Sequence, residues 1–111
     1  MSYITDTLHL SKINEFVNTR EEIWNKIYED SDTINNLLNS ISINLNQELG
    51  ISNIMFDINT MKITIIRNST IPVSNIVINT QLFLIMKDVF NIESPIMDII
   101  TNWGNLIEIK L

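Results

Sequence analysis

The sequence predicts a single α+β domain over residues 1–111, with N-terminal helices and an antiparallel or mixed four-stranded sheet. Two observations indicate this fold class. Apolar residues in the first half recur at spacings of three and four, as on one side of a helix, whereas several stretches of the second half alternate with a period of two, as in strands. The expected order of elements is α-α-β-β-β-α-α-β, with the helices packed on one face of the sheet.

Residues 11–49 carry one continuous apolar stripe of helical spacing, so they form either one helix or two. The segment 29–33 is typical of a helix end followed by a new N-cap, which favours two helices with a break near Ser31. A single helix would be about 58 Å long, at a rise of about 1.5 Å per residue, and would imply an oligomer. In both cases Gly50 is the expected C-terminal stop.

The period of two then predicts a hairpin with strands over 54–58 and 61–67, joined by a tight turn. A loop over 68–72 leads to a third strand over 73–79, where Ile and Val dominate. We expect Thr80 to cap the next helix, which carries its apolar residues between Leu82 and Phe90.

Ser94 followed by Pro95 is typical of a further helix start, and that helix should run to Trp103 and stop at Gly104. The last residues, 106–111, alternate again and are expected to form a terminal strand.

Composition argues against catalysis. The chain has no cysteine, which excludes disulfides, thiolate metal sites and a cysteine nucleophile. Only two glycines occur, so no glycine-rich phosphate loop can form, and the single histidine, His9, lacks partners for a metal site. The pair Asp30 and Asp32 does not continue as a calcium loop and is better explained as a helix cap. The sequence therefore predicts no enzyme activity, no cofactor and no metal ion.

Charge argues against a nucleic-acid or membrane partner. Seven basic residues against thirteen acidic ones give a net charge of −6, which cannot form a broad positive footprint for nucleic acid. No stretch is apolar enough to span a membrane, and no secretory signal is recognised at the N-terminus. We therefore expect a cytoplasmic protein. The 23 Ile and 16 Asn residues are typical of an AT-rich genome, such as that of a phage, virus or mobile element, in which case the host cytoplasm is the expected location.

The acidic residues concentrate in the N-terminal helical part, where residues 1–50 hold eight acids and three bases. A helical acidic face steers a protein toward a partner with a basic surface. The candidate partner-binding residues are Glu15, Glu22, Glu29, Asp30 and Asp32.

The strands suggest self-association. Ile66 and Val77 fall on the strand face opposite the main apolar set, and the terminal strand 106–111 has only Glu108 and Lys110 to discourage further pairing if it lies at a sheet edge. We therefore expect a homo-oligomer, most simply a homodimer, in which another copy covers part of this surface.

These observations favour a small acidic, non-enzymatic protein that acts by binding another protein. Three alternatives stay open: an inhibitor that mimics nucleic acid and blocks a host defence nuclease, a small-molecule sensor or enzyme with a pocket between helix and sheet, and a minor virion or assembly component.

Overall fold

The computed structural model describes residues 20–92 and 97–111, and within them the chain is an α+β fold. Residues 20–29 are helical, and we refer to them as segment 20–29. The remaining elements are α2 (Ser31–Leu49), β1 (Ile51–Asp57), β2 (Lys62–Arg67), α3 (Asn75–Phe90), β3 (Asp98–Asn102) and β4 (Leu106–Lys110). The predicted fold class is confirmed, and the predicted order of elements is followed except between residues 73 and 103.

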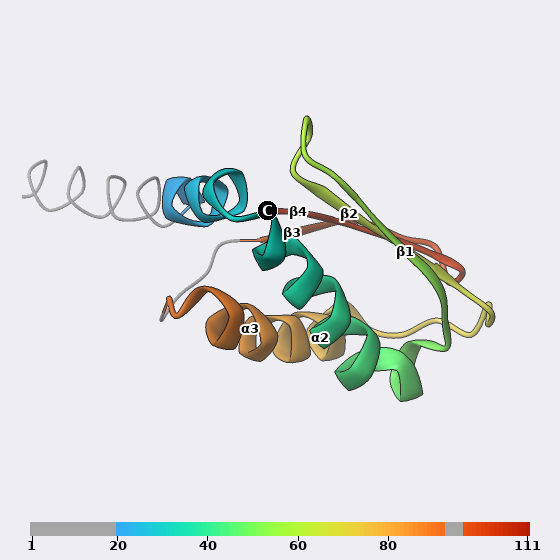
Figure 1. Ribbon diagram of the computed structural model, residues 1–111. Coiled ribbons are helices and arrows are strands. Elements are labelled where there is room, and N and C mark those ends of the chain that lie inside the picture. The colour runs from blue at the N-terminus through green and yellow to red at the C-terminus, as the bar shows by residue number, and fades with distance from the viewer. Residues whose placement is uncertain (1–19, 93–96) are drawn as a thin grey trace, which may run out of the picture.

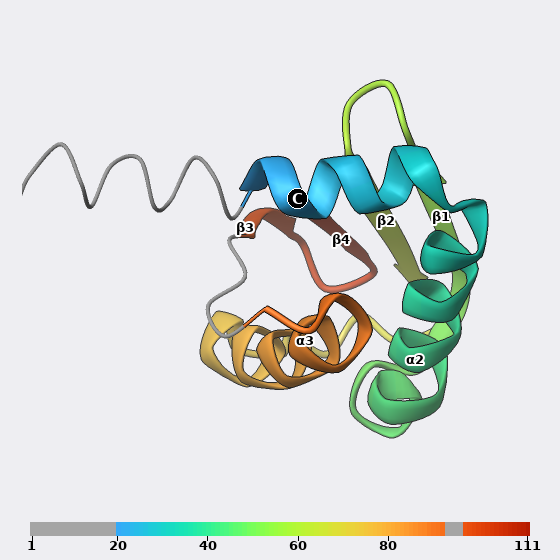
Figure 2. The same ribbon diagram turned by 60° about the vertical axis from the view of Figure 1, so that its left-hand side comes forward.

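The sheet is antiparallel throughout and has the strand order β1-β2-β4-β3. Figure 1 shows α2 and α3 on one face of this sheet, with segment 20–29 beside its end, next to the C-terminus. Figure 2, turned by 60°, shows the same side covered by all three helical stretches. The core lies between these helices and the sheet face that carries Ile63, Ile65, Ile107 and Ile109, all fully buried.

Over the described residues 20–49, the long apolar stripe of the N-terminal half forms two helical stretches, as the favoured alternative predicts. The helix is interrupted at Asp30, whose backbone is extended (φ −137°, ψ 105°). The Asp30 side chain accepts a hydrogen bond from the backbone N–H of Asp32. α2 ends at Gly50, which adopts the left-handed conformation (φ 63°) that glycine reaches without steric cost. Its N–H donates to the carbonyl of Asn46, which closes the helix.

The predicted strand over 73–79 is wrong, because α3 begins at Asn75. Ser74 is the N-cap, and its hydroxyl accepts from the N–H of Val77, so Thr80 lies inside the helix and does not cap it. The run of β-branched residues favours a strand locally. Tertiary packing overrides this preference, because Ile78, Leu82 and their helical neighbours reach the core only at a spacing of three and four.

The predicted helix from Pro95 to Trp103 is also wrong over the part that the structure describes. Residues 98–102 form β3, while 93–96, including the expected cap at Ser94, lie outside the described residues. Gly104 does not end a helix but turns β3 into β4. It has a φ of 72°, and an added Cβ would lie 2.8 Å from the carbonyl oxygen of Thr70, so only glycine fits.

The terminal strand β4 lies inside the sheet and not at an edge, where the sequence analysis considered placing it. β4 pairs with β2 on one side and β3 on the other, so the edges are β1 and β3. Each edge strand has a register irregularity, between Ile51 and Asn53 and between Ile99 and Thr101. Bulges of this kind discourage edge-to-edge pairing, so the sheet edges offer little support for self-association.

Candidate functional site

Segment 20–29 carries the candidate acidic face and is held to the fold from three directions. Ile23 and Ile27 are buried in the core. The indole Nε1 of Trp24 donates to the carbonyl of Leu111 over 3.1 Å, and the ammonium of Lys26 donates to the carbonyl of Phe90 over 3.0 Å. These contacts tie the segment to the chain end and to the end of α3, so its exposed side chains project from a fixed frame.

Two predicted residues, Glu22 and Glu29, come together at one hollow. They are seven residues apart, which places them on the same side of a helix two turns apart. Both are exposed, and both line an open hollow of about 270 Å³. The other lining residues are Asn25, Lys26, Phe90 and Ile92. The hollow therefore combines two carboxylates and the ammonium of Lys26 with two apolar residues, the buried Phe90 at the end of α3 and Ile92 just after it.

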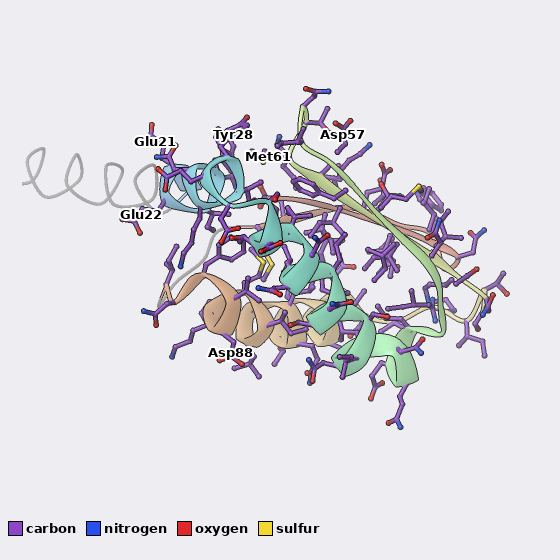
Figure 3. The ribbon with its side chains drawn as sticks, in the orientation of Figure 1. Glu21, Glu22, Tyr28, Asp57, Met61 and Asp88 are labelled. Atoms are coloured by element: carbon purple, nitrogen blue, oxygen red, sulfur yellow. The ribbon has the colours of Figure 1, made fainter. Side chains whose placement is uncertain are left out.

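The adjacent residue Glu21 does not join this hollow. Figure 3 shows Glu21 on the same side of segment 20–29 as Tyr28, and Glu22 on the side that faces α3. Neighbouring residues of a helix are about 100° apart around its axis, so they face different surroundings. The segment thus presents acidic groups on two sides, and only Glu22 and Glu29 adjoin the apolar end of α3.

Asp30 and Asp32 lie at the start of α2, where both stabilise the helix. The Asp30 carboxylate accepts from the N–H of Asp32 over 3.0 Å, and Asp32 lies in the first turn, where negative charge is favourable. Both are exposed, so they also add to the acidic surface. Glu15 and His9 lie outside the described residues.

The buried charge of Arg67 is held by backbone oxygens and not by a carboxylate. Its side chain is 6 % exposed. The guanidinium donates to the carbonyls of Leu49, Ile71 (2.8 Å) and Gly104 (2.6 Å). These acceptors come from the end of α2, from the loop before α3 and from the β3–β4 turn. Arg67 therefore has a structural role that joins three parts of the fold.

The sheet face opposite the helices carries one polar network. The Glu108 carboxylate lies 2.6 Å from the ammonium of Lys62 and accepts from the hydroxyl of Thr101 over 2.8 Å. The hydrogen bond from Lys62, followed by that from Thr101, lowers the pKa of Glu108 below its ordinary value. The lowered pKa reflects a salt-bridged carboxylate that stays ionised, which is the opposite of what a general acid needs.

Neither a metal cluster nor a membrane span emerges from the described ranges. Residues 20–92 and 97–111 contain no group of three or more His, Asp or Glu side chains placed to hold a metal ion. No helix within these ranges is both long enough and apolar enough to cross a membrane.

Two features of the surface were missed by sequence reasoning. Phe90 and Ile92 adjoin Glu22 and Glu29 only because α3 ends beside segment 20–29, and no local signal reveals that contact. The exposed apolar side of α3 begins within residues 73–79, where the run of β-branched residues predicts a strand; the same residues at helical spacing indicate an apolar side.

Comparisons of the chain with protein-family models, with curated proteins and with solved structures found no match.

Proposed function

We propose that this chain is a non-enzymatic, regulatory protein of the cytoplasm that acts by binding a partner protein with a basic surface. The observation that carries the proposal is the pairing of Glu22 and Glu29 beside the apolar side chains of Phe90 and Ile92. A lysine or arginine side chain has the same division, with an apolar stem and a charged end. The hollow would receive such a side chain, with its stem on the apolar residues and its charge at a carboxylate.

The distribution of charge also favours a partner with a basic surface. Residues 20–32 hold five acids, Glu21, Glu22, Glu29, Asp30 and Asp32, against the bases Arg20 and Lys26. Arg20 pairs with Asp98 over 3.2 Å, and Lys26 donates to the carbonyl of Phe90. The acids exceed the bases here, and an excess of one charge sign raises the rate at which an oppositely charged partner is encountered.

Charge reversal at the hollow tests the proposal. The tagged full chain and its double variant Glu22→Lys/Glu29→Lys are used to capture proteins from the native host, and the bound proteins are quantified by mass spectrometry. The control is Glu21→Lys/Glu48→Lys, which changes the net charge equally at two exposed positions away from the hollow. Far-UV circular dichroism verifies that both variants are folded.

We expect the hollow variant to lose a basic partner by about tenfold or more, equivalent to about 1.4 kcal/mol, and the control to retain it. Equal capture by all three proteins would contradict the proposal. Equal loss in both variants would also contradict it, because long-range charge and not the hollow would then determine binding.

A further inference from the structure

The outer side of α3 is apolar, although that side faces away from the core. The exposed residues Ile76, Val77, Phe83 and Leu84 are 78 %, 40 %, 38 % and 54 % exposed, respectively. The buried residues Ile78 and Leu82 lie on the opposite side of the same helix. α3 therefore has a second apolar side that the described residues do not cover.

These four residues are arranged symmetrically about Thr80. Ile76 and Val77 precede it by four and three residues, and Phe83 and Leu84 follow it by three and four. At about 100° per residue, all four lie within about 60° of Thr80 around the helix axis. In an antiparallel pair of identical helices related by a two-fold axis at Thr80, Ile76 lies beside Phe83 of the other copy, and Val77 lies beside Leu84.

This apolar side is self-complementary, because an antiparallel second copy would place apolar residues opposite apolar residues. In a two-fold contact, if residue i of one copy touches residue j of the other, then j also touches i. We infer that a second copy of this chain docks on α3, through an antiparallel pair of α3 helices centred on Thr80.

Charge favours the same occupant. The chain has a net charge of −6, so two copies repel each other wherever their acidic surfaces meet. Residues 75–86 contain no charged side chain, and Lys87 and Asp88 fall at the ends of the contact. The outer side of α3 therefore lets two acidic copies approach without placing carboxylates opposite each other.

Thr80 itself also fits this contact. The hydroxyl of Thr80 donates to the carbonyl of Ile76 over 2.8 Å, so burying Thr80 leaves its donor satisfied. This contact does not involve Glu22 or Glu29 and stands independently of the proposed function.

Single cysteines test the geometry directly, because the chain has no cysteine of its own. In the folded full chain, Thr80→Cys lies on the two-fold axis and should form a disulfide between copies under mild oxidation. Ile76→Cys alone should not, because the two thiols would be offset by eight residues, about 12 Å along the axis, beyond the reach of a disulfide. The double variant Ile76→Cys/Phe83→Cys should cross-link again, since each thiol then lies beside a thiol of the other copy.

The control is Ile43→Cys, at an exposed position on α2. We expect cross-linked dimers at least tenfold more abundant for Thr80→Cys than for Ile43→Cys. A short bis-maleimide repeats the comparison without the strict geometry of a disulfide. Equal yields at positions 80 and 43 with both reagents would overturn the inference. Efficient cross-linking of Ile76→Cys alone would also overturn it, because it indicates parallel helices.

Discussion

The helices α2 and α3 pack on the same sheet face, but they differ in what they leave exposed. α2 buries one stripe of residues at a spacing of four, and its large exposed apolar residue is Ile43. α3 buries an equivalent stripe and still exposes Ile76, Val77, Phe83 and Leu84. The described residues bury the apolar side chains of α2 almost completely, whereas they leave these four side chains of α3 exposed. This difference is the basis of the contact that we infer between two copies.

The largest expected effect concerns the buried sides of the two helices, which should behave alike. Leu37 on α2 and Leu82 on α3 are both fully buried. Replacing either by alanine should lower the free energy of unfolding by about 2–5 kcal/mol, because each substitution removes buried apolar contacts and leaves a cavity. Urea denaturation monitored by circular dichroism measures both. A loss below about 1 kcal/mol at either site would mean that this helix is not packed as described.

A substitution at Arg67 tests whether its side chain holds the end of α2 to the loop before α3. Arg67→Met keeps much of the side-chain volume but removes the donors to three carbonyls. We expect a loss of about 3 kcal/mol, because buried acceptors are left without a partner. Arg20→Met is the matched control: it breaks the exposed pair with Asp98 and should cost less than about 1 kcal/mol. Similar losses for the two arginine variants would contradict this role.

The N-caps offer a finer comparison of the same helices. Asp30→Ala at α2 and Ser74→Ala at α3 should each reduce stability by about 1 kcal/mol, because each removes a side-chain acceptor for a backbone N–H of the first turn. Asp30→Asn keeps a capping oxygen and removes the charge, so its unfolding midpoint should stay near that of the unaltered chain. If Asp30→Asn destabilises as much as Asp30→Ala, then the charge and not the cap determines the stability.

The smallest expected effect lies on the sheet face that no described helix covers. The pKa of Glu108 is lowered in the folded state, so the unfolded state takes up a proton at this group first. Its contribution to stability is present above its ordinary pKa of 4.5 and is lost as the pH falls through the lower, folded-state value. Glu108→Gln should therefore flatten the loss of stability below pH 4.5. An unchanged acid profile in urea titrations would contradict this contribution.

The sequence predicts the regular parts of the fold well. The stripe from Ile23 to Leu49, the break before α2, the stop at Gly50 and the hairpin of β1 and β2 all follow from local spacing and turn residues. These features succeed because neighbouring residues determine them, through helical periodicity, capping and alternation.

Prediction fails where tertiary packing outweighs local preference. Ile76, Val77 and Ile78 favour a strand as a run, yet they start α3 because Ser74 caps it and Ile78 reaches the core. At the candidate site, the spacing of Glu22 and Glu29 was visible in the sequence, whereas Phe90 and Ile92 beside them depend on a contact between distant segments. The capping role of Asp30 was also anticipated, since Asp before a helical stripe is typical of an N-cap.

The most direct test of the difference between α2 and α3 is the molar mass of the full chain in solution, measured by light scattering over a concentration series. Three proteins are compared: the unaltered chain, Leu84→Glu on α3 and Ile43→Glu on α2, two changes of equal charge at exposed apolar positions. We predict that the unaltered chain and Ile43→Glu approach twice 12.9 kDa as concentration rises, while Leu84→Glu stays at 12.9 kDa. A mass of 12.9 kDa for the unaltered chain at every concentration, or the same dimerisation in both glutamate variants, would contradict the account.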